Sequence, residues 1–206
     1  MIRFAIVILG LCGCVASGSY ASKPAFTFSV NNPSSFERID EGLTIKRQQV
    51  VAAFPKMNEK LLPVLKTIGG IEIPSQVDDL DKDGKWDEIA FVYSFKPNEK
   101  LEASVEFVSA DKYPSYTKRT QMRLGSSPLR NGTFESATSE IRPKDYVAQS
   151  LPLRYQLEGP GWESDKIAFR SYFDSRNGKD IFGKVTTDMV IHKIGINEDY
   201  HKLQKW

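Results

Sequence analysis

The stretch Leu101-Glu102-Ala103-Ser104-Val105-Glu106-Phe107 alternates between apolar and polar side chains. Because successive side chains of a β-strand point to opposite faces, this order predicts a strand with one buried face and one wet face. Residues 151–157 alternate in the same way. Residues 89–95 are partly apolar on both faces, which indicates an interior strand. We also expect strands at residues 26–30, 167–173 and 189–194.

Turn-forming residues separate these stretches, as at Gly69-Gly70, Asp83-Gly84 and Asn177-Gly178. Many short strands divided in this way predict an all-β fold, an antiparallel β-sandwich with few helices. The one helix candidate, residues 58–67, has a proline in its interior, so an extended conformation stays open. Residues 125–149 are polar and irregular, which predicts a long loop of the kind that often borders a cleft.

The composition suits one ordinary domain with a targeting segment. The chain has 206 residues, of which 40% are hydrophobic, and 28 basic side chains stand against 26 acidic ones. A net charge of +2 gives no support to nucleic-acid binding, which requires many cations to neutralise phosphates. The two cysteines, Cys12 and Cys14, lie near the N-terminus, so a metal cluster of Cys and His ligands is not expected in the body of the chain.

Residues 1–21 predict an export signal. Arg3 precedes an apolar run, residues 4–11, that is shorter than the roughly 20 residues a membrane-spanning helix requires. Two processing routes fit: residues 11–14 resemble a bacterial lipobox with the lipid on Cys14, and residues 19–21 offer a signal peptidase a cut after Ala21. We favour the lipoprotein, exported to the periplasm or cell surface and held at the membrane only by its lipid. Residues 22–206 are expected to form a single β-rich domain.

An acidic turn, residues 76–88, is the most specific local motif. Ca²⁺ prefers six to eight oxygen ligands, and a short acidic loop with a glycine at its sharp turn supplies several of them. The candidate ligands are the side chains of Asp79, Asp81, Asp83 and Asp87 and the carbonyl of Lys85. A complete EF-hand would have Glu at the twelfth position, where this chain has Ala. The two interpretations are a structural calcium loop between strands and a solvated turn without an ion.

A second constellation follows the turn at residues 159–161. Trp162, Glu163 and Asp165 lie at the entry of a predicted strand that carries Arg170 and Tyr172 on one face. An indole that stacks on a sugar ring, acids that exchange protons and an arginine that binds a carboxylate suit an acidic carbohydrate. A buried tryptophan beside a structural ion pair is the plainer interpretation. His201 is a candidate general base, whereas His192 fits a structural role better.

Three segments together resemble a family of secreted bacterial domains of unknown function. They are residues 28–33, residues 73–84 with Asp87-Glu88, and the run Trp162-Glu-Ser-Asp-Lys-Ile-Ala-Phe-Arg170, and the likeness covers about residue 25 to the C-terminus. Such domains are commonly encoded in polysaccharide-utilisation loci for uronic polysaccharides of the pectin or ulvan type. The resemblance implies a β-sandwich, with a mutarotase-like supersandwich, incomplete in this chain, as one form. This chain ends earlier than family members usually do.

The resemblance also implies carbohydrate chemistry of the lyase or dehydratase type, an elimination on oligosaccharides that contain uronic acid. Elimination requires a cation beside the carboxylate, a base for the C–H and an acid for the departing oxygen. We expect Arg170 as the cation, His201 or Tyr172 as the base, and Glu163 or Asp165 as the acid, with Trp162 binding the sugar. The alternative is a non-catalytic, calcium-stabilised glycan-binding lipoprotein. A purely structural lipoprotein is a third hypothesis.

Overall fold

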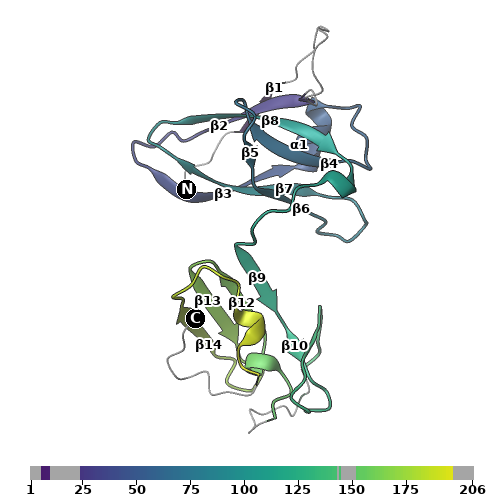
Figure 1. Ribbon diagram of the computed structural model, residues 1–206, viewed down its shortest axis with the longest axis vertical. Helices are drawn as coiled ribbons and strands as arrows, with labels where there is room; N and C mark the ends of the chain where they lie inside the picture. Colours follow the sequence, from purple (N-terminus) through teal and green to yellow (C-terminus); the bar gives the residue numbers. More distant parts are fainter. Residues whose placement is uncertain (1–5, 10–23, 143, 145–151, 197–206) are drawn as a thin grey trace. The chain divides into compact units, whose positions relative to one another are not determined.

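The computed structural model describes residues 6–9, 24–142, 144 and 152–196. The chain divides into two compact units, Met1–Tyr116 and Thr117–Trp206, whereas the sequence predicts one domain over residues 22–206. Figure 1 shows the two units, each with its own sheets. Cys14, Ala21 and His201, to which the sequence assigns processing or catalysis, lie outside the described residues. No helix within the described residues is long and apolar enough to cross a bilayer.

The N-terminal unit consists of two antiparallel sheets. One has the strand order β1-β2-β8-β4-β5 and the other the order β3-β7-β6. The strands of the first sheet are β1 (Ile6–Leu9), β2 (Phe26–Asn31), β8 (Lys100–Val108), β4 (Leu62–Thr67) and β5 (Glu72–Ile73). Those of the second are β3 (Arg38–Lys46), β7 (Glu88–Phe95) and β6 (Ser75–Asp78). A short helix, α1 (Arg47–Ala53), and a 3-10 turn, η1 (Ala110–Lys112), complete the unit.

A shared core lies between these two sheets. Leu101, Ala103 and Val105 of β8 are buried, and they belong to the same cluster as Ile89 and Phe91 of β7. Phe28 of β2 and Phe91 meet edge to face, with ring centroids 6.2 Å apart. The predicted antiparallel sandwich is confirmed in this unit, because the apolar faces of both sheets are buried against each other.

The C-terminal unit contains a four-stranded antiparallel sheet with the order β14-β13-β12-β9. Its strands are β9 (Thr120–Arg123), β12 (Gly161–Ser164), β13 (Ile167–Ser171) and β14 (Lys179–Gly183). A small hairpin, β10 (Gly125–Ser126) with β11 (Glu135–Ser136), lies within the predicted loop 125–149, and the rest of that loop that is described has no regular structure. Two 3-10 turns, η2 (Gln156–Glu158) and η3 (Ile191–Lys193), contribute Leu157 and Ile191 to a second core.

Of the two conformations left open at residues 58–67, the extended one is confirmed, because Leu62–Thr67 form strand β4 and the segment contains no helix. Pro63 has no N–H to donate and would clash with the preceding turn of a helix. In β4 the proline is tolerated because β5 pairs only with Leu65 and Lys66, which leaves the β4 edge open at Pro63. The helix α1, the one α-helix among the described residues, was not predicted. It is short and buries only Val50, so it has no apolar period to detect.

Two predicted strands of the C-terminal unit are also wrong. At residues 151–157 the described part ends in η2, where Leu157 and Glu158 have φ of 59° and 58°, which no strand accommodates. At residues 189–194 the chain forms η3 instead. There the backbone N–H groups of Val190 and Ile191 donate to Glu163 Oε1, at 2.7 and 2.8 Å, and so do not form a ladder.

Candidate functional site

The hairpin of β12 and β13 carries the residues of the predicted carbohydrate site, and it sorts them onto two faces. Trp162 lies opposite Phe169 in this antiparallel pair, and Glu163 lies opposite Ala168. Because side chains alternate along a strand, Trp162 and Phe169 share the outer face of the sheet, whereas Glu163 and Arg170 are buried on the inner face. The hairpin does not bring the indole and the predicted catalytic groups to one surface.

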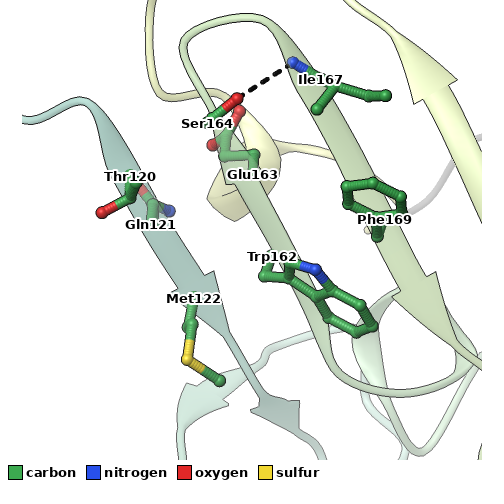
Figure 2. A pocket seen from close by; sticks show the side chains of 8 residues that line it. All are labelled: Thr120, Gln121, Met122, Trp162, Glu163, Ser164, Ile167 and Phe169. Carbon is green, nitrogen blue, oxygen red and sulfur yellow. Dashed lines mark hydrogen bonds between the residues drawn. The ribbon is translucent and has the colours of Figure 1, made fainter. Parts of the chain in front are cut away.

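On the outer face, Trp162 stacks on Phe169. The ring centroids are 5.6 Å apart and the ring planes differ by 15°. Beside this pair is an open hollow of about 630 Å³, called here the Trp162 hollow. Figure 2 shows its lining residues, which come from the strands β9, β12 and β13. They are Thr120, Gln121, Met122, Trp162, Glu163, Ser164, Ile167 and Phe169, although the Glu163 side chain is itself completely buried. The hollow therefore combines an aromatic wall with small polar side chains.

An apolar row crosses the whole outer face at the level of Trp162. The strand registers place Met122 opposite Trp162, Trp162 opposite Phe169, and Phe169 opposite Ile181. Met122 is 80% exposed and Ile181 is 68% exposed. The aromatic pair thus lies between two exposed aliphatic side chains, one on each edge strand of this sheet.

Glu163 is fully occupied on the inner face. Its Oε2 accepts a hydrogen bond from Lys184 Nζ at 2.5 Å, and both side chains are completely buried. Its Oε1 accepts the two backbone N–H bonds that begin η3. Lys184 Nζ also donates to the carbonyls of Ser164 and Asp188. The carboxylate therefore joins β12 to the segment that leads into η3, and its charge is balanced by a buried lysine.

Arg170 is also buried, with none of its side chain exposed. It lies opposite Asp180 in the β13–β14 pair, and its Nε donates to Asp180 Oδ2 at 2.8 Å. The guanidinium also hydrogen-bonds the Tyr172 hydroxyl and lies 4.1 Å from the centroid of that ring. Arg176 lies equally close to the Tyr172 ring. Two arginines and one aspartate thus surround Tyr172.

Burial raises the pKa of the Tyr172 hydroxyl above its usual value of about 10, although the charge of Arg170 acts in the opposite direction. A phenol with a raised pKa stays protonated at neutral pH. It is therefore poorly suited to remove a proton from carbon.

Asp165 lies at the turn between β12 and β13, away from these buried groups. Its Oδ2 accepts a hydrogen bond from Arg119 Nε at 2.7 Å, and its N–H donates to the Arg119 carbonyl. Both residues line a second hollow of about 420 Å³. Of the predicted acids, Asp165 is the one nearer solvent, and it is already paired. His192 is exposed on η3, with Nδ1 3.1 Å from the Gln121 amide nitrogen.

The acidic turn joins β6 to β7, as predicted for a loop between strands. Asp79, Asp81 and Asp87 each have a carboxylate oxygen within 4.8 Å of the others. Asp79 also accepts N–H bonds from Asp83 and Gly84. Three carboxylates are fewer than the six to eight oxygens that Ca²⁺ prefers, so carbonyls or water would have to complete the shell.

The other two predicted ligands lie beside this group. The Asp83 carboxylate accepts the Lys85 N–H at 2.8 Å. The Lys85 ammonium pairs with Glu59 at 3.2 Å. The donor set is compatible with a hard cation on the exposed side of the loop.

Comparison with protein families gives one match. Residues 30–206 match the model of a domain of unknown function, DUF4861, which is more than four-fifths of the chain. The chain belongs to the DUF4861 family. The predicted membership of a domain family of unknown function is therefore confirmed. No curated protein and no solved structure matched.

In this DUF4861 protein, the outer-face residues other than Trp162 were not predicted as site residues. Met122 lies in β9, a strand of four residues with three polar side chains, which gives little periodic signal. Phe169 has a usable signal. The turn at residues 165–166 sets the hairpin register and so places residue 169 opposite residue 162. Pairing across a predicted hairpin would therefore have found the second aromatic ring of the hollow.

Proposed function

We propose that this DUF4861 protein is a non-catalytic glycan-binding protein that acts in polysaccharide degradation and binds sugars in the Trp162 hollow. The observation that carries the proposal is the stacked pair of Trp162 and Phe169 on an open sheet face. A buried aromatic pair would serve packing. An aromatic pair beside a hollow of about 630 Å³ is available to a ligand.

The chemistry of the hollow suits a sugar. A pyranose ring presents C–H groups on its flat face and hydroxyls around its rim. The indole offers a large apolar face for the former. The hydroxyl of Thr120 offers a donor and an acceptor for the latter, and the hydroxyl of Ser164, whose oxygen accepts N–H bonds from Lys166 and Ile167, offers a donor. The preference for uronic acids rests on the family resemblance alone.

Elimination is the less favoured function. The two oxygens of Glu163 are held by Lys184 and by backbone N–H groups. Arg170 is enclosed by Tyr172, Asp180 and the sheet, so a substrate carboxylate has no direct approach to it. Proton transfer and carboxylate binding both require contact with substrate. The buried groups are better explained as the support of the outer face.

Titration of the full chain with neutral and uronic oligosaccharides tests the proposal. Wild-type protein should bind at least one of them, and Trp162→Ala should weaken that affinity at least about tenfold, or about 1.4 kcal/mol. Ile181→Ala is the matched control, since Ile181 is an exposed apolar residue of the same face outside the hollow. Mass spectrometry of the same mixtures detects turnover. A product that loses water, or a cleaved product, would favour elimination, and equal affinity of wild type and Trp162→Ala would contradict binding in the hollow.

A further inference from the structure

We propose that Met122 is a site of reversible oxidation, and that its conversion to the sulfoxide by a peroxide releases a glycan from the Trp162 hollow. This inference rests on the proposed function, because it concerns the regulation of the same site. It starts from an unusual placement, a methionine that is exposed and also lines a hollow.

Exposure distinguishes Met122 from the other described methionines. Its side chain is 80% exposed, whereas Met57 and Met189 are partly buried. Met57 packs against the core of the N-terminal unit. Reaction with a dissolved oxidant requires access to the sulfur, so Met122 should react before the other two. Its strand, β9, is an edge strand of the sheet.

The position of Met122 couples its chemistry to the hollow. It lies directly opposite Trp162 in the β9–β12 pair, where side chains on one face have Cβ atoms about 4.5–5.5 Å apart. Its thioether is flexible and apolar, and it can follow the contour of a ring that rests on the indole. The hollow is thus bounded by aromatic carbon on one strand and by a thioether on the next.

Oxidation replaces this apolar wall with a polar one. A peroxide transfers one oxygen atom to the sulfur: the O–O bond breaks, an S–O bond forms, the sulfur loses two electrons, and the remaining oxygen leaves as water, or as an alcohol from an organic peroxide. The sulfoxide oxygen accepts hydrogen bonds and is strongly hydrated. A ligand that covers it must strip this water or lose contact with Met122. Methionine sulfoxide reductases reverse the step.

The experiment uses the full chain, hydrogen peroxide and the oligosaccharide that binds most tightly to reduced protein. Peptide mass spectrometry follows oxidation at each methionine, and titration measures affinity before and after. Met122 should gain oxygen first, and affinity should fall at least about tenfold, or about 1.4 kcal/mol. A reductase should restore it. Met122→Leu, which keeps an apolar wall without sulfur, should bind before and after peroxide, and Met122→Gln should bind weakly without it.

Three results would overturn the inference while leaving the proposed function intact. One is oxidation of Met57 or Met189 ahead of Met122. Another is unchanged affinity once Met122 is fully converted. The third is an equal loss of affinity in peroxide-treated Met122→Leu. If the reduced protein binds no oligosaccharide, the proposed function fails, and the regulation of that site fails with it.

Discussion

Trp162 and Glu163 are consecutive residues of β12, yet their side chains lie on opposite faces of the sheet. The indole stacks on Phe169 beside an open hollow, whereas the carboxylate is paired with Lys184 in the interior. This relationship separates two roles that the sequence places side by side. The outer face is available to a ligand, and the inner face holds the unit together.

We expect Glu163→Gln to destabilise the C-terminal unit by about 3–5 kcal/mol, because the substitution leaves the buried Lys184 ammonium without its counter-charge. Chemical denaturation followed by circular dichroism measures the change. Adding Lys184→Met should recover part of the loss, since it removes the unpaired charge. Glu102→Gln, which removes an exposed ion pair with Lys100, is the control and should change stability little. A free energy of unfolding for Glu163→Gln equal to that of the wild type would argue against a structural role for Glu163.

Gly159→Ala should destabilise the same unit by about 1–3 kcal/mol or more, the usual range for an overpacked site. A Cβ at residue 159 would lie 2.0 Å from the Ser171 carbonyl oxygen. Backbone hydrogen bonds from Ser171 to Pro160 and from Phe173 to Glu158 hold this crossing on both sides, so the chain cannot easily withdraw. Gly183→Ala is the matched control, because a Cβ there meets nothing within 4 Å. Equal thermal midpoints for the two variants would contradict the close approach.

The free energy of unfolding should fall in acid, partly because the Asp174 carboxylate becomes protonated. Hydrogen bonds from Arg176 hold the pKa of this buried carboxyl below its usual range. A carboxyl with a lowered folded-state pKa stabilises the protein above its unfolded pKa of about 3.9, and this stabilisation is lost as pH falls through the lower folded pKa. Unfolding free energies measured below about pH 5 should therefore decline less steeply in Asp174→Asn. Arg176→Gln should flatten the profile in the same way, and an unchanged slope in both variants would contradict the coupling.

Calcium should raise the thermal midpoint if it binds the loop of Asp79, Asp81 and Asp87. An ion that binds only the folded state stabilises it by about 2.7 kcal/mol at a concentration one hundred times its Kd. Melting with calcium and with chelator measures this difference. The double variant Asp79→Asn, Asp81→Asn should abolish it, whereas Asp111→Asn, an acidic position outside the loop, should not. Identical thermal midpoints of the wild-type protein with calcium and with chelator would show that the loop does not bind calcium.

The alternation of apolar and polar residues was sufficient to predict the main strands. Period two at residues 101–107 and 89–95 gave β8 and β7, and β7 lies between β3 and β6 as expected of an interior strand. The face of β8 that was expected to be wet is partly buried, at Ser104 and Glu106. Such strands are predictable because the alternation of apolar and polar residues is a local pattern along the chain. The same rule failed at residues 151–157, where Gln156 is buried as well as its apolar neighbours. Its amide donates to the carbonyls of His192 and Ile194, contacts distant in sequence.

For the candidate site, the sequence by itself determined which residues are present and that Trp162 and Glu163 must face opposite ways if they lie in a strand. Only the tertiary structure decided which of the two faces is open. That choice depends on the segment from Lys184 to η3, which covers the inner face and supplies the partners of Glu163. A buried charge is tolerated only where such partners are in place, and they come from residues about 20 to 30 positions away in the chain. Side-chain periodicity carries no information about contacts at that separation.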